Sequence, residues 1–135
     1  MPTILSDHDV EGHLDVLLTI WTSSRWAELW HGLGCQVETL KSLGLPTDTV
    51  DSEVWLFCQA HKMVLITANR NSEGEDSLER ASQRLNRPDS LPVLTLADPD
   101  RVLADREYAE KVAGQVLEIL FDLDHLRGTR RLFVP

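Results

Sequence analysis

Three groups of residues in this chain carry carboxylate or amide side chains that could take part in chemistry. Asp7 and Asp9 follow a short apolar run near the start of the chain. Asp51 and Glu53 open a stretch with helical spacing. A third group follows a continuous apolar run and comprises Asn69, Asn71, Glu73, Glu75 and Asp76. Carboxylate and amide oxygens are the ligands that Mg²⁺ and Mn²⁺ prefer, so the three groups together predict a divalent-cation site.

The chemistry that such a site predicts is hydrolysis of a phosphodiester. A bound Mg²⁺ or Mn²⁺ could activate a water molecule for the attack and stabilise charge on a phosphate oxygen. Arg70 would then be the nearest cation to the scissile phosphate. Arg80, Arg84 and Arg87 recur along one face of an expected helix and could hold the phosphate backbone of the substrate, although a solvated helix face gives the same spacing.

The elements that must position these groups can be read from the spacing of the apolar residues. Expected strands cover residues 2–6, 35–40, 63–67, 92–96 and 132–134. Expected helices cover 12–23, 26–30, 49–61, 76–86 and 105–125. Thr49 is the expected N-cap of the third helix, and the glycines at 32 and 34 are expected to end the second.

The alternation of strands with helices predicts an α/β fold with a largely parallel central sheet. In such sheets, ligands bind in the crevice outside the carboxyl ends of the strands. The first and third polar groups follow the strands expected at 2–6 and 63–67, and the second group opens the helix before the latter strand. We therefore expect all three groups to share one crevice.

Composition limits the classes of protein that the chain can represent. Its 135 residues fit one globular domain covering 1–135, and its formal net charge of −9 disfavours non-specific binding to nucleic acid. A role on nucleic acid would therefore depend on a local basic patch. No stretch reaches the roughly 20 apolar residues of a membrane span, and no signal peptide is recognisable, so we expect a cytoplasmic protein without membrane contact.

Cysteines and tryptophans add further expectations. Cys35 and Cys58 lack metal-site spacing and are expected to be buried free thiols. Two of the four tryptophans, Trp21 and Trp55, are expected to pack in the core, whereas Trp26 and Trp30 together could expose an interface patch. A homodimer is among the assemblies that we consider.

The order of the motifs resembles a known family, the PIN-like domains, and in particular their small stand-alone DUF5615-type, Mut7-C-like branch. The segments that carry the resemblance are Leu5-Ser6-Asp7-His8-Asp9-Val10, Val50-Asp51-Ser52-Glu53-Val54-Trp55 and Leu65-Ile66-Thr67-Ala68-Asn69-Arg70-Asn71. The resemblance covers about residues 3 to 72. It implies a three-layer α/β/α Rossmann-like fold of the PIN type, metal-dependent cleavage of RNA, and a toxin-like protein with a small antitoxin-like partner.

The chain departs from the pattern of that family in its third group. Asn69 and Asn71 stand where the family has two aspartates, and amides bring no negative charge to a cation. A second hypothesis is therefore a catalytically degenerate PIN-like module that serves in interaction or regulation without a metal. A response-regulator receiver also clusters acids after its first strand, but it needs a phosphoacceptor aspartate after a later strand, whereas Asp51 is expected at the start of a helix.

Overall fold

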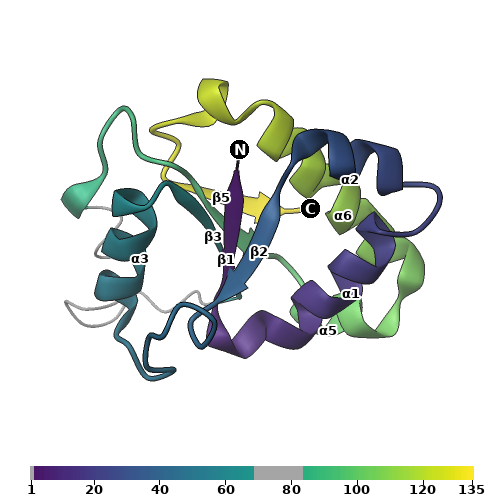
Figure 1. Cartoon of the computed structure of the whole chain (residues 1–135), viewed down its shortest axis with the longest axis horizontal. Helices are drawn as coiled ribbons and strands as arrows, with labels where there is room; N and C mark the ends of the chain where they lie inside the picture. The colour runs from purple at the N-terminus through teal and green to yellow at the C-terminus, as the bar shows by residue number, and fades with distance from the viewer. Residues whose placement is uncertain (1, 69–83) are drawn as a thin grey trace.

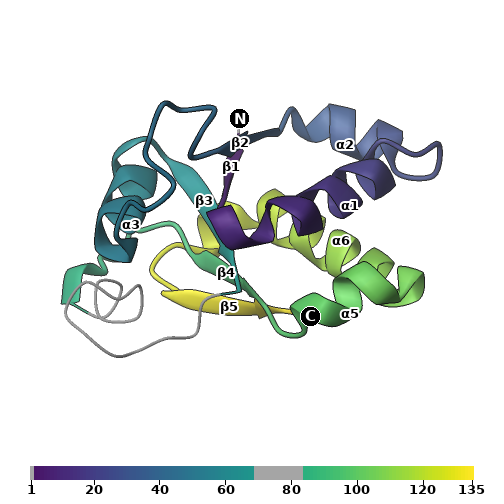
Figure 2. The ribbon, with the colours of Figure 1, turned by 90° about the horizontal axis from the view of Figure 1, so that it is seen from below.

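The sheet is the centre of the molecule, and all of its strand pairings are parallel. The computed structural model describes residues 2–68 and 84–135. In this part of the chain the strands are β1 (Thr3–Ser6), β2 (Gln36–Thr39), β3 (Met63–Thr67), β4 (Val93–Leu96) and β5 (Arg131–Val134). They lie in the order β2-β1-β3-β4-β5 (Figures 1 and 2). The predicted parallel sheet is confirmed, with the strand at 63–67 in its middle and the strand at 35–40 on its edge.

Helices cover both faces of this sheet. The described helices are α1 (Glu11–Trp21), α2 (Ala27–Leu33), α3 (Asp51–Ala60), α5 (Pro99–Ala104) and α6 (Arg106–Phe121), with 3₁₀ turns at His8–Val10 and Leu123–Leu126. Figures 1 and 2 show α3 on one side of the sheet and α1 and α6 on the other. The chain therefore forms a three-layer α/β/α fold of the Rossmann-like type, as predicted. None of its described helices has the length and apolar character needed to cross a lipid bilayer.

The sheet separates two apolar clusters, because successive side chains of a strand point to opposite faces. Ile4 belongs to the larger cluster, which includes α1 and α6, whereas Leu5 belongs to the smaller cluster beneath α3. Both strand residues are fully buried. A strand covered on both faces reads as a continuous apolar run, and this is why the run at 63–67 predicted a central strand correctly.

Each cluster contains one free cysteine, as predicted. Cys35 packs in the larger cluster and Cys58 in the smaller one. Burial raises the pKa of the Cys35 thiol to about 11 and that of the Cys58 thiol to about 12. Both groups are therefore neutral thiols near neutral pH.

Trp21 joins the helices of the larger cluster. Its indole Nε1 donates a hydrogen bond of 3.1 Å to the backbone oxygen of Ala113 in α6. Its ring stacks on Trp30, with the ring centroids 4.6 Å apart. Trp21 and Trp55 are core residues, as predicted, but Trp30 is only 7% exposed. The expectation of an exposed patch formed by Trp26 and Trp30 is therefore wrong, because stacking on Trp21 takes Trp30 into the core.

Helix ends follow short-range polar contacts, and two of the predicted ends are corrected. Gly34 ends α2 with a left-handed φ of 67°, as expected of a glycine cap. Thr49 does not cap α3, because its hydroxyl donates to the Pro46 oxygen instead. The helix expected at 105–125 ends at Phe121, and Asp105 caps its start by accepting from the Tyr108 N–H.

Candidate functional site

Asp7 lies at the point of the sheet where the strand order reverses. The chain passes from β1 to β2 on one side and later returns to β3 on the other side of β1. In doubly wound sheets this switch point opens a crevice outside the carboxyl ends of the strands, where ligands bind. Ser6, the last residue of β1, pairs with Ile66, so Asp7 stands beside the end of β3.

The carboxylate of Asp7 is held by two hydrogen bonds. The Thr67 hydroxyl donates to Oδ2 at 2.7 Å, and the His8 N–H donates to Oδ1 at 2.8 Å. The backbone is fixed as well, because the Asp7 N–H donates to the Ile66 oxygen at 3.0 Å. A carboxylate offers about four lone-pair sites, so two remain for a ligand. Asp7 is therefore an oriented acceptor at the carboxyl ends of β1 and β3.

Thr67 is a site residue that the sequence analysis did not single out. It is fully buried at the end of β3, and its hydroxyl orients Asp7 from the neighbouring strand. The signal that could have revealed it is positional. If β1 and β3 are neighbours in a parallel sheet, a polar residue at the end of one strand faces the polar residue that follows the other.

Asp7 and Asp51 both lie within electrostatic reach of Asp9. Partial burial of the Asp9 carboxyl raises its pKa, and the charges of Asp7 and Asp51 raise it further, whereas a backbone hydrogen bond and His13 act in the opposite sense. Asp51 is the half-buried first residue of α3, and the positive end of the helix dipole favours a negative charge there. The three predicted carboxylates therefore share one electrostatic environment.

Other predicted site residues lie apart from these three acids or outside the described structure. Glu53 is exposed in the first turn of α3. Arg84 lines a separate pocket. The residues of the third group and the two upstream arginines fall outside the described residues, and they are Asn69, Arg70, Asn71, Glu73, Glu75, Asp76 and Arg80. Their predicted roles stay predictions.

The three acids offer the type of ligand atom that a hard divalent cation prefers, but the described residues do not group enough of them to hold one. Asp7, Asp9 and Asp51 offer only oxygen ligands, and the mutual repulsion that raises the pKa of Asp9 is one that a cation would relieve. Within residues 2–68 and 84–135, however, no three side chains of His, Cys, Asp or Glu are grouped closely enough to hold a metal ion. The described residues therefore form an acidic group near the carboxyl end of β1, in which the Asp7 carboxylate is held by hydrogen bonds.

Comparison of the chain with protein-family models, with curated proteins and with solved structures found no match.

Proposed function

We propose that this protein is a Mg²⁺- or Mn²⁺-dependent nuclease that hydrolyses phosphodiester bonds in RNA at the crevice between β1 and β3. The observation that carries the proposal is the hydrogen bond from the Thr67 hydroxyl to Asp7 at the reversal of the strand order. A buried hydroxyl that orients a half-buried carboxylate toward a ligand crevice supports a binding role for that carboxylate.

Each of the three acids has a distinct task in the proposed site. Asp7 supplies an oxygen in a fixed position, because both of its oxygens already accept hydrogen bonds from the protein. Asp9 supplies a second carboxylate, and Asp51 adds charge from the start of α3. A bound Mg²⁺ or Mn²⁺ would supply a nucleophilic water at neutral pH and neutralise charge on the phosphate.

RNA as the substrate, and a small antitoxin-like protein as the partner, rest on the resemblance to PIN-like domains. Arg70 remains the cation proposed to meet the scissile phosphate. A cytoplasmic location is supported by Cys35 and Cys58, which are both free thiols. Free cysteines are usual where the surroundings are reducing.

Two measurements test the proposal together. We expect wild-type protein to cleave single-stranded RNA in the presence of Mn²⁺ and to show a higher melting temperature when Mn²⁺ is added. Asp7→Asn should lose both effects, with a fall in cleavage rate of at least about 100-fold, because it removes the oriented charge. Asp15→Asn is the matched control, since Asp15 is an exposed aspartate of α1. Equal cleavage by wild type and Asp7→Asn would overturn the assignment.

A second candidate is a metal-free module for interaction or regulation. It is favoured by Asn69 and Asn71, which stand where the family that the chain resembles has aspartates, and by the net negative charge of the chain. In that case calorimetric titration with Mn²⁺ should detect no site tighter than about 1 mM. A tighter site that disappears in Asp7→Asn would exclude the module.

A further inference from the structure

A pocket of about 530 Å³ lies between α3 and the segment at residues 84–91. Lys62, Leu91 and Arg127, which line it, precede β3, β4 and β5, so it opens toward the amino ends of the strands. Asp7 and Thr67 lie at the carboxyl ends of β1 and β3. The pocket is therefore separate from the acidic group, and its ligand is not part of the proposed nuclease site.

The wall of the pocket is held in a fixed shape by hydrogen bonds. The side-chain amide of Gln59 in α3 donates to the Leu91 oxygen at 3.0 Å and accepts from the Leu91 N–H at 2.9 Å. Ser90 Oγ accepts from the Arg87 N–H at 2.9 Å. The Gly128 N–H donates to the Ser90 oxygen at 2.8 Å. These contacts join three segments of the chain, so the pocket is pre-formed rather than a loose surface hollow.

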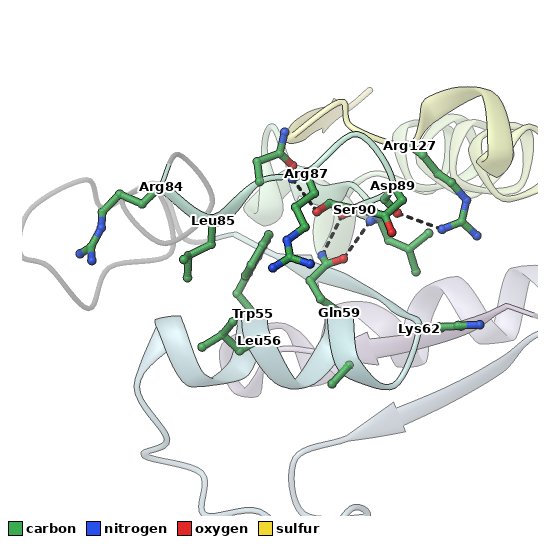
Figure 3. Close-up of a pocket in the computed structure, with 13 residues that line it drawn as sticks. Trp55, Leu56, Gln59, Lys62, Arg84, Leu85, Arg87, Asp89, Ser90 and Arg127 are labelled. Carbon is green, nitrogen blue, oxygen red and sulfur yellow. Dashed lines mark hydrogen bonds between the residues drawn. The ribbon is translucent and has the colours of Figure 1, made fainter.

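The charge of the pocket is opposite to that of the whole chain. The chain carries a formal net charge of −9, yet the described residues that line the pocket include four cations and one acid, which are Lys62, Arg84, Arg87, Arg127 and Asp89. Arg127 already donates to the Asp89 backbone oxygen at 3.0 Å. Figure 3 shows the Arg87 side chain extending toward α3, between Trp55 and Gln59 in that view, whereas Arg84 points away. Arg87 is therefore the central cation.

Trp55 belongs to the wall of the pocket and not to its accessible surface. Its side chain is only 2% exposed, and its indole Nε1 is buried. Arg87, by contrast, is an exposed residue of the pocket, and its guanidinium can only donate hydrogen bonds. The pocket therefore offers donors and positive charge to an anionic ligand.

We infer that this pocket binds a small phosphorylated molecule with a flat apolar body, namely a mononucleotide. The phosphate would accept hydrogen bonds from Arg87, whose planar guanidinium suits a phosphate. The apolar body would pack on Leu56, Leu85 and Leu91, which line the same pocket. A volume of about 530 Å³ is in the range of small-molecule sites and limits the occupant to one such molecule.

The test is calorimetric titration of the full chain with adenosine 5′-monophosphate, adenosine and inorganic phosphate. We expect the mononucleotide to bind more tightly than about 1 mM and more tightly than either fragment. Arg87→Gln should weaken binding about tenfold, since it removes the charged donor to the phosphate. Arg106→Gln is the matched control, because Arg106 is an exposed arginine of α6 outside the pocket.

Several outcomes would overturn the inference. It fails if the mononucleotide does not bind, if inorganic phosphate binds equally well, or if Arg87→Gln binds as wild type does. Arg87 is exposed, so its substitution leaves the core intact. Asp7→Asn should keep wild-type affinity for the mononucleotide, and this separates the pocket from the proposed nuclease site.

Discussion

At the scale of single residues, the contact between Thr67 and Asp7 is the most consequential one in the molecule. The hydroxyl is fully buried and donates to a charged group. Hydrogen bonds to charged groups contribute more than neutral ones, and a carboxylate that loses its donor keeps the cost of its burial. The pair should therefore affect both stability and the geometry of the crevice.

Replacing Thr67 by valine tests the strength of this contact. Thr67→Val keeps the shape of the side chain but removes the donor, so we expect the free energy of unfolding at pH 7 to fall by about 1–2 kcal/mol in urea denaturation. Thr19→Val, on the exposed face of α1, should change it by less than about 0.5 kcal/mol. If Thr67→Val costs as much in an Asp7→Ala background as in wild type, the two residues are not coupled.

Asp9 gives a prediction with a definite sign in pH. Its pKa is raised in the folded protein, so the folded state binds the proton more tightly than the unfolded state, and ionisation of Asp9 opposes folding. This unfavourable contribution is absent below the unfolded pKa and grows as pH rises through the folded pKa. Asp9→Asn should therefore raise the melting temperature at pH 7, by less than about 2 °C because Asp9 is exposed and solvent screens its charge.

A series of thermal melts between pH 3 and pH 8 checks the prediction for Asp9. The gain from Asp9→Asn should shrink toward zero at the acidic end, where the carboxyl is protonated in both states. Asp15→Asn, on exposed α1, should show no such trend. A gain that is constant over the whole range would contradict an origin in the ionisation of Asp9.

At the scale of elements, the end of α2 depends on a single glycine. Gly34 has a φ of 67°, a conformation that costs an L side chain about 1 kcal/mol. Gly34→Ala should lower the free energy of unfolding by about that amount. Gly12→Ala is the matched control, because a Cβ at Gly12 in α1 would meet nothing within 4 Å, so no loss is expected there. Equal effects in chemical denaturation of the two variants would refute the role of Gly34.

Most elements could be predicted from the sequence because burial on two faces leaves a clear pattern. The strand at 63–67 has the predicted bounds, and the strand at 35–40 was placed at an edge by its alternation. Helix ends were less predictable, since they depend on which polar contact forms. Thr49 has the right residue type for a cap, but its hydroxyl bonds backward to Pro46. Helix α5 was missed, although Asp98 before Pro99 is a start signal.

The candidate site could be predicted only in part. Strand ends placed Asp7 and Asp9 at the carboxyl edge of the sheet, because that edge follows from the chain order of a parallel sheet. The direction of each side chain depends on packing and hydrogen bonding, which cannot be predicted from the spacing of residue types. For this reason Thr67 was missed. Arg84 and Arg87 were expected to bind the substrate beside the acids, whereas both line the pocket between α3 and residues 84–91.

At the scale of the whole molecule, the two ends of the strands differ in charge, and the two faces of the sheet carry separate apolar clusters. Acids gather beyond the carboxyl ends of β1 and β3, whereas Lys62, Arg87 and Arg127 gather toward the amino ends of the strands. The acids thus favour cationic ligands at the carboxyl ends of the strands, whereas the cations favour anionic ligands at the amino ends. An excess of negative charge elsewhere on the chain repels anions in general, so binding of an anion must depend on local contacts rather than on the long-range field.

The one cysteine in each apolar cluster makes the two helical layers separately observable. A buried thiol with a raised pKa reacts only when its surroundings open, because the thiolate is the reactive form. Pulsed alkylation at pH 8 followed by mass spectrometry should therefore report local opening at each thiol.

We expect Gly34→Ala to accelerate labelling of Cys35, its neighbour in the chain, several-fold more than labelling of Cys58. Equal acceleration at both thiols would mean that the layers open together. The labelling rates of the two thiols thus show which face of the sheet opens first.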